Sequence, residues 1–325
     1  MYNDIKLDKN MYNISGKSFS EVLAKLDPDD NYSDTSLRDL DAFERQLKRF
    51  DIKINGNDCD TVSKFFTTTE SAVLFPEFIR RQIKQGFDDT SYVGKYAASI
   101  INADDIEFSA LNVVDDGKSC QITEGTEMGK ITVTTKSSSA GKFAKALKIS
   151  YESIQRKRID TFAVLLKQLG MSIARDLNAN LIPSIGEMTS NVVSVKESAF
   201  SYATLVDFWE SMSDFDMDTI LCSKDLYAQI LNFDEIKNQI STGVSTDNSC
   251  IKTPFGVTIV PVPGITTTNY YGISSKYCYE LVQCGEMTVE TGKLITLQFD
   301  EIAASVLMGV NKINPDAVQK LTVTA

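Results

Sequence analysis

Asp115–Gly141 is the segment that most restricts how this chain can fold. It is rich in glycine, serine, threonine and charged residues, and it has few large apolar side chains. A segment this long with so little apolar surface cannot form a core of its own. We therefore expect an extended β-hairpin arm that rests on a neighbouring molecule.

A long helix is predicted soon after this arm. Apolar residues recur at helical spacing from Ser150 to about Ile182, on a face that includes Phe162, Leu166 and Ile173. Roughly thirty residues at about 1.5 Å each make a helix on the order of 45 Å long, which is enough to span a domain.

Helices and strands alternate in the rest of the chain. Alternating apolar residues predict β-structure between about Ala97 and Leu147. Further on, the pattern predicts helices at 202–211 and 224–230, and strands at 219–222, 255–264, 277–283, 287–289, 294–299 and 321–323. The fold class is therefore α+β.

Residues 1–69 differ from the rest in carrying short amphipathic helices. Ser18 and Glu21 have the spacing of a capping box, so a helix should begin there and end before Pro28. A second helix is predicted over 37–50, with a narrow apolar stripe that includes Leu37, Leu40, Phe43 and Leu47. This stripe either contacts a partner molecule or packs on the chain's own domain, and the sequence leaves both open.

Basic residues gather between the arm and the start of the long helix, with Glu152 as the acidic exception. They form a solvated positive face, an electrostatic contact with an acidic patch on another copy, or, as a third choice, a nucleic-acid surface. The residues are Lys136, Lys142, Lys145, Lys148, Arg156, Lys157 and Arg158.

No catalytic, cofactor-binding or metal site is predicted. The chain has no histidine, which removes the usual general base and the usual zinc ligand. Its six cysteines contain no C-x-x-C pair, and no glycine-rich phosphate-binding motif is present. The net charge of −11 argues against an overall basic surface that binds duplex DNA. The first ten residues lack the apolar stretch of a secretory signal, which favours an intracellular protein.

Three stretches resemble the major capsid proteins of tailed bacteriophages, whose fold is shared with encapsulins. Ala72–Arg81 contains Leu-Phe-Pro-Glu-Phe, which is similar to a stretch near the N-terminal arm of that family. Leu147–Asp160 resembles the start of the family's spine helix, and Phe255–Gly264 resembles a strand and turn of its axial domain. The resemblance covers about residues 70–325 and is carried mainly by the order of the elements.

The resemblance implies a fold with an N-terminal arm, an extended β-hairpin called the E-loop, a long spine helix in a peripheral domain, and an axial domain. The implied boundaries are an N-terminal helical extension at 1–69, the continuation of the arm and the start of the peripheral domain at 70–114, the E-loop at 115–146, the spine helix at 147–190, the axial domain at 191–285, and the return to the peripheral domain at 286–325.

The implied function is that of a major capsid protein. Copies would form the hexamers and pentamers of an icosahedral shell around phage double-stranded DNA, in a virion capsid assembled in the host cytoplasm. The implied partners are the chain itself and scaffold, portal and decoration proteins, with the DNA facing the inner wall without sequence-specific binding and no membrane involved. The seven basic residues and the four stripe residues are the candidate inter-subunit contacts.

Three alternatives follow from the same sequence. An encapsulin-type shell would have the same fold but enclose a protein cargo. A histidine-free enzyme that uses two carboxylates would need converging Asp or Glu side chains in a deep pocket, and no such pair is indicated. A phage tail-tube protein would fit the long helix poorly.

Overall fold

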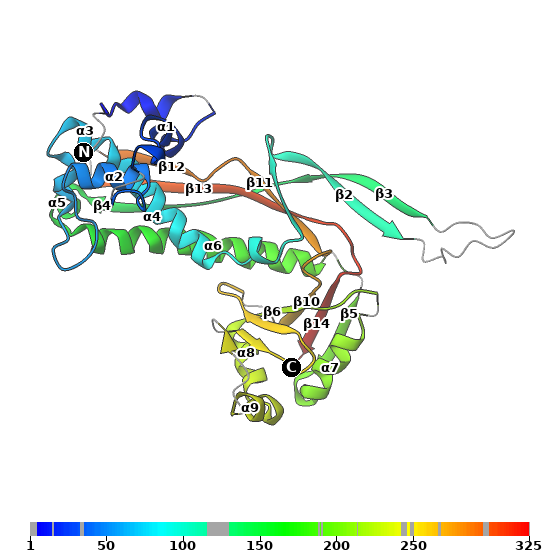
Figure 1. Cartoon of the computed structure of the whole chain (residues 1–325). Helices are drawn as coiled ribbons and strands as arrows, with labels where there is room; N and C mark the ends of the chain where they lie inside the picture. The colour runs from blue at the N-terminus through cyan, green and yellow to red at the C-terminus, as the bar shows by residue number, and fades with distance from the viewer. Residues whose placement is uncertain are drawn as a thin grey trace. The chain divides into compact units, whose positions relative to one another are not determined.

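The computed structural model describes most of the chain, in two compact units (Figure 1). Unit 1 comprises Met1–Asp89, Ala144–Ser172 and Thr288–Ala304, and unit 2 comprises Thr90–Phe143, Ile173–Met287 and Ser305–Ala325. The described residues are 5–14, 16–32, 36–115, 130–187, 189, 191–212, 214–241, 246–247, 250–265, 268–294 and 299–324.

Short helices form the N-terminal part of unit 1. The predicted capping box is confirmed: the Ser18 hydroxyl accepts a hydrogen bond from the Glu21 amide, and α1 begins at the next residue, Phe19. A second capping box, formed by Asp41 and Glu44, starts the next helix five residues later than the apolar stripe suggested. The elements are η1 (Lys9–Asn13), α1 (Phe19–Leu26), η2 (Asp29–Tyr32), α2 (Ala42–Arg49), η3 (Val62–Phe66), α3 (Thr69–Ala72) and α4 (Leu74–Thr90).

One buried ion pair lies inside this N-terminal part. The Arg45 guanidinium donates to the Asp27 carboxylate at 3.1 Å, and both side chains are fully buried. The same guanidinium also donates to the Asp27 carbonyl and the Asp29 carboxylate, at 2.6 and 2.8 Å. Buried charges are tolerated when they are paired and hydrogen-bonded in this way.

The predicted long helix is present, but it is two helices. α5 (Tyr151–Arg156) ends at Lys157, whose backbone is extended, and α6 (Ile159–Glu187) follows. A residue outside both helices stabilises this break, because the Lys157 carbonyl accepts a hydrogen bond from the Val62 amide. Unlike the prediction, α6 continues through Pro183.

Within unit 1, α4 crosses the first half of α6 at very close range. A Cβ atom on Gly170 would overlap the Ile83 carbonyl, and one on Gly86 would overlap the Lys167 carbonyl. Glycine at both positions therefore lets the two backbones touch. The unit also contains β12 (Thr288–Leu294) and most of β4 (Gly141–Ser150).

In unit 2, β1 (Ser99–Ala103) pairs in parallel with β11 (Tyr279–Cys284), and β11 pairs antiparallel with the second half of β13 (Phe299–Lys312). Beside this ladder, the Asn178 amide of α6 donates to the Thr90 and Pro263 carbonyls at 2.9 and 3.2 Å. Its oxygen accepts from the Tyr92 amide, so this buried polar side chain ties α6 to two loops.

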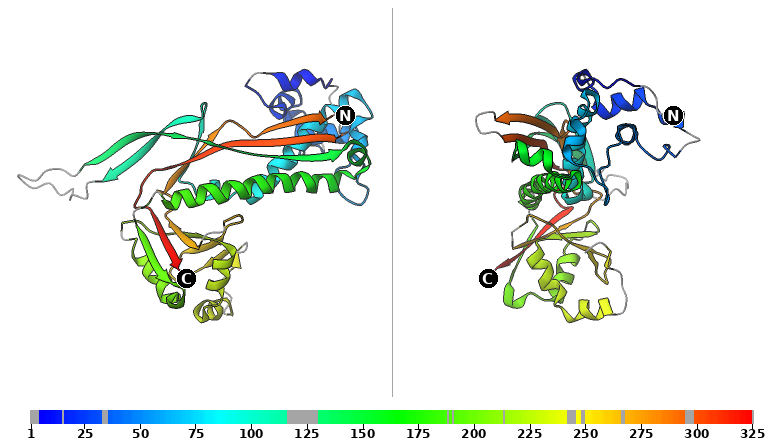
Figure 2. Two further views of the ribbon diagram at one scale, coloured as in Figure 1. Left: turned by 180° about the vertical axis from the view of Figure 1, so that it is seen from behind. Right: turned by 90° about the vertical axis from the view of Figure 1, so that its left-hand side faces the viewer.

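A second sheet forms the other part of unit 2 (Figure 2). Helices α7, α8 and α9 pack against it, in a core that includes Leu205, Phe208, Ile230, Ile259 and Leu321. Among the described residues the strand order is β5-β14-β10-β6-β9-β8-β7. The strands are β5 (Val192–Lys196), β6 (Thr219–Cys222), β7 (Thr246–Asp247), β8 (Cys250–Lys252), β9 (Thr258–Pro261), β10 (Asn269–Ile273) and β14 (Val318–Thr324), and the helices are η4 (Gly94–Tyr96), η5 (Glu197–Ala199), α7 (Tyr202–Glu210), α8 (Lys224–Leu231) and α9 (Asp234–Ser241).

These bounds refine several predictions. The strand predicted over 255–264 is confined to β9, because Gly256 and Gly264 adopt positive φ angles of 88° and 95° that end the extended backbone on each side. The predicted strand 294–299 lies partly at 295–298, outside the described residues, and Phe299 opens β13. No helix in the described part of the chain combines the length and the apolarity needed to cross a membrane.

Candidate assembly surfaces

The predicted arm is a two-stranded hairpin. β2 (Glu107–Asp115) and β3 (Ile131–Ser139) pair antiparallel from Glu107↔Ser139 to Asp115↔Ile131. In the described residues this ladder is a sheet of its own, and 116–129 of the predicted arm lie outside them. The strands begin at Glu107, earlier than predicted, because the alternating residues before Asp115 supply the partner for β3.

The hairpin is anchored in its own unit at its base and again near the outer end of the described ladder. The Ala140 amide at the base donates to the Ile106 carbonyl at 2.9 Å, and the Val113 amide, in the pair with Val133, donates to the Ile313 carbonyl at the same distance. Phe108 packs on a small core cluster formed by Ala140, Val282 and Cys284.

The rest of the hairpin leaves apolar side chains uncovered. Ile131 is 67% exposed, Val133 58% and Val114 45%. Ile131 and Val133 are two residues apart in β3 and share one face of the ladder, whereas Val114 pairs with Thr132 and lies on the opposite face. An isolated two-stranded ladder is marginal without a covering partner, so these exposed side chains are the candidate contacts of the hairpin.

Several basic residues have partners within the same chain. Lys148 lies 3.6 Å from the Glu301 carboxylate, and the Lys145 ammonium donates to the Ser172 hydroxyl at 2.6 Å. Arg158 donates to Asp160 at 2.8 Å, and this ion pair raises the pKa of the Arg158 guanidinium. The same pair lowers the pKa of the Asp160 carboxyl.

The other basic candidates are placed differently. Lys142 and Arg156 are exposed, and Lys157 is half-buried at the break between α5 and α6. Lys136 lies in β3 opposite Ala110, and its side chain is outside the described residues. The cluster therefore does not form one uniform set: Lys142, Lys148, Arg156 and Arg158 are exposed, and two of these, Lys148 and Arg158, pair with carboxylates of their own chain.

The apolar stripe of the N-terminal part packs on its own chain. Phe43 and Leu47 are buried in α2, and Leu37 and Leu40 are half-buried in the turn before it. This placement is the second of the two alternatives that the sequence left open. An inter-subunit role for Phe43 or Leu47 would require α2 to leave this position.

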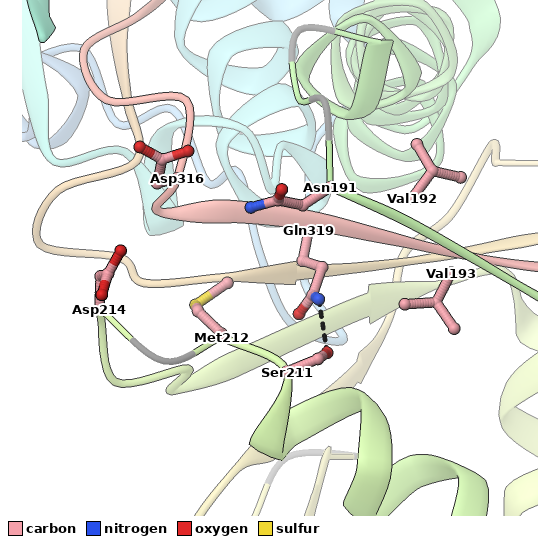
Figure 3. A pocket seen from close by; sticks show the side chains of 8 residues that line it. All are labelled: Asn191, Val192, Val193, Ser211, Met212, Asp214, Asp316 and Gln319. Atoms are coloured by element: carbon pink, nitrogen blue, oxygen red, sulfur yellow. Dashed lines mark hydrogen bonds between the residues drawn. The ribbon is translucent and has the colours of Figure 1, made fainter.

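A hollow of about 550 Å³ in unit 2 shows no catalytic arrangement (Figure 3). The Ser211 hydroxyl accepts a hydrogen bond from the Gln319 amide and donates to the Phe208 carbonyl, so no base activates it. Asp214 and Asp316 are both exposed. The hollow is lined by Asn191, Val192, Val193, Ser211, Met212, Asp214, Asp316 and Gln319. In the described part of the chain, no three Cys, Asp or Glu side chains are placed to hold a metal ion.

Comparison with solved structures shows the fold of virus shells. The virus-like particle from Pyrococcus furiosus is 12% identical, with a TM-score of 0.55, over 75% of this chain and 98% of that chain. The capsid of a native GTA particle is 12% identical, with a TM-score of 0.53, over 72% and 90% of the two chains. The capsid of cyanophage P-SCSP1u is 12% identical, with a TM-score of 0.51, over 72% and 89%.

Sequence comparison gives the family. Among curated proteins, none matches this chain. The family model described as phage capsid protein matches residues 133–321, which is more than half of the chain and includes most of β3, the long helix and most strands of both larger sheets. The chain therefore belongs to the phage capsid protein family and is a structural subunit of a virion shell.

Proposed function

We propose that this chain is the major capsid protein of a phage whose hexamers and pentamers form a closed icosahedral shell around double-stranded DNA. The hairpin β2–β3 carries the proposal, because it displays Val114, Ile131 and Val133 to solvent although its base packs on a core cluster. In a shell made of copies of one chain, a surface repeated by symmetry supplies the missing cover.

The net charge of −11 fits the inner wall of such a shell. A wall of that sign repels packaged DNA instead of binding it, so the DNA can be loaded and released. We further propose assembly in the host cytoplasm with scaffold, portal and decoration proteins. The domain boundaries implied by the capsid family, with the hairpin as the E-loop, belong to the same proposal.

The test is to express the chain alone and with the other head proteins of its phage. We expect closed shells by negative-stain electron microscopy, built from hexamers and pentamers, and nuclease-protected double-stranded DNA in particles purified from infected cells. Shells that hold one abundant enzyme and no DNA would favour the encapsulin-type alternative. A chain that stays monomeric at high concentration in both settings would refute the proposal.

A further inference from the structure

Residues 5–66 form a helical lobe that is attached to the body of unit 1 in two places. This segment lies outside both the region covered by the resemblance at 70–325 and the family model at 133–321. We call it the N-terminal lobe. The first attachment adds a donor to the fully buried Glu77 carboxylate, and the second supplies acceptors to backbone N–H groups at the start of α6.

The first attachment centres on Glu77 of α4. This side chain is fully buried, and its carboxylate accepts hydrogen bonds from Arg80 and Arg81, each at 3.0 Å. The third donor is the Ser20 hydroxyl of the lobe, at 2.6 Å. Burial by itself raises the pKa of the Glu77 carboxyl, but the hydrogen bonds from Arg80 and Ser20 outweigh burial, and the net shift is downward.

Arg81 and Val73, the residue before α4, add further contacts to this attachment. Arg81 donates to the Asp41 carboxylate and to Ser20, and its guanidinium lies 4.4 Å from the centre of the Phe43 ring. The Tyr12 hydroxyl donates to the Val73 carbonyl at 2.7 Å. The lobe therefore contacts α4 and the residue before it through three of its own segments, around Tyr12, Ser20 and Asp41–Phe43.

The second attachment caps α6. The first turn of any helix has backbone N–H groups without partners inside the helix. Here the Ile159 amide donates to the Asp60 carbonyl at 2.9 Å, and the Asp160 amide donates to the Cys59 sulfur at 3.4 Å. The lobe thus supplies the N-terminal cap of the longest helix.

Aromatic side chains connect the two attachments. Phe65 at the end of the lobe is fully buried and lies 5.4 Å from the ring centres of both Phe75 and Phe78 in α4. Phe75 in turn stacks on Phe162 of α6 at 6.0 Å. Without the lobe, this row of rings would lose its first member, and the faces of Phe75 and Phe78 that Phe65 covers would be exposed.

We propose that the N-terminal lobe is a permanent, docked part of the shell subunit, which holds α4 and the start of α6 in place, and that assembled shells retain it. The statement about shells rests on the proposed function. The statement about docking concerns the single subunit and holds or fails without any shell.

The experiment separates the lobe covalently without unfolding the chain. A site for a specific protease is inserted between Thr67 and Thr68, in the exposed linker, and the folded subunit is cut there. We expect the cut lobe to co-elute with the rest of the subunit in size-exclusion chromatography, with the melting temperature lowered by only a few degrees. A lobe that elutes separately from a subunit with unchanged melting temperature overturns the proposal.

Glu77→Gln tests the first attachment, with Glu152→Gln as the matched control. Glu152 is an exposed glutamate in α5, away from the attachment. We expect the cut lobe to dissociate at least tenfold faster from Glu77→Gln, with faster hydrogen exchange in α1 and α2, and no change in the control. Equal release from Glu77→Gln and wild type would contradict the role given to this carboxylate.

The same variants give a pH signature. The pKa of the Glu77 carboxyl is lowered from its ordinary 4.5 in the folded subunit. Its contribution to docking of the lobe is therefore present above pH 4.5 and is lost as the pH falls through the lower pKa of the folded state. The fraction of cut lobe that stays bound to the wild-type subunit should be constant from pH 7 to about pH 5 and should fall only below pH 4.5. The groups that face Glu77 are Tyr12, Arg80 and Arg81, and Asp41 pairs with Arg81. Glu77→Gln should therefore lose the part of this fall that Glu77 causes.

If shells form, the cut particles give the second readout. We expect them to retain the lobe fragment in stoichiometric amount by mass spectrometry of washed shells. Intact, unchanged shells that have lost the fragment would overturn the retention claim, whereas a failure of wild-type chains to form shells bears on the proposed function alone.

Discussion

The hairpin β2–β3 and the N-terminal lobe are both poor in apolar residues, but the hairpin exposes several of them whereas the lobe buries them against its own chain. The hairpin exposes Ile131 and Val133, and its ladder is a separate sheet. The lobe buries Phe43 and pairs its charges, including a fully buried Arg45. The difference shows that a sparse apolar pattern does not determine whether a segment packs on its own chain. The segment packs there only if the rest of the chain provides a complementary surface.

The largest expected effect comes from shortening the hairpin. Val113 and Val133 are paired residues, so replacing 114–132 with Asn-Gly should close a two-residue turn across them and keep the hydrogen bond from Val113 to Ile313. We expect a folded subunit with near-native circular dichroism and no closed shells by electron microscopy. Wild-type-like shells from this variant would refute the assembly role of the hairpin.

The lobe should respond to a single substitution inside it. Arg45→Met leaves the fully buried Asp27 carboxylate without its main partner, which costs about 3–5 kcal/mol. We expect local opening of the lobe, measured as faster hydrogen exchange in α1 and α2. Arg38→Met, at an exposed arginine in the turn before α2, is the control and should change little. Protection in Arg45→Met equal to that of the control would show that the buried pair does not hold the lobe.

Substitutions in the hairpin should change shell assembly more than they change the stability of the subunit. Ile131→Thr with Val133→Thr changes residues that are already exposed in the subunit, so its stability should shift by less than about 0.5 kcal/mol. In a shell, each lost apolar contact costs about 1 kcal/mol. The threshold concentration for assembly, measured by light scattering, should therefore rise roughly thirtyfold. A large drop in subunit melting temperature would mean that these residues pack within their own chain.

The smallest effects should separate two neighbouring arginines. Arg156 is exposed, whereas Arg158 pairs with Asp160 and donates to the Gly56 carbonyl of the lobe. Arg156→Glu should weaken assembly about threefold and make it less sensitive to salt, without changing subunit melting. Arg158→Glu should lower the melting temperature instead. Identical behaviour of the two variants would remove the distinction between an assembly contact and an internal pair.

Local patterns made several elements predictable. The capping box at Ser18 set the start of α1, and apolar periodicity found α7, α8, β6 and the long helix. The hairpin was predicted from the composition of 115–141, but its first strand, β2, comes from the alternating residues before that segment. These predictions rest on residues that are close together in the sequence.

The features that could not be predicted depend on distant residues. The break at Lys157 is held by Val62, and Glu77 is satisfied by Ser20, 57 residues away. The partner of Lys148 is Glu301, which no spacing rule connects to it. For the same reason the basic cluster, which is continuous in sequence, divides in space into internal pairs and exposed side chains.

The amino-acid sequence by itself determined several helices and strands whose residues are local, such as α1, α7 and β6, and it indicated a hairpin with little apolar surface. Only the tertiary structure decided that residues 5–66 dock on their own chain. A narrow apolar stripe fits any matching surface, and the matching surface here is assembled from α4 and the start of α6, which come together only when the chain has folded.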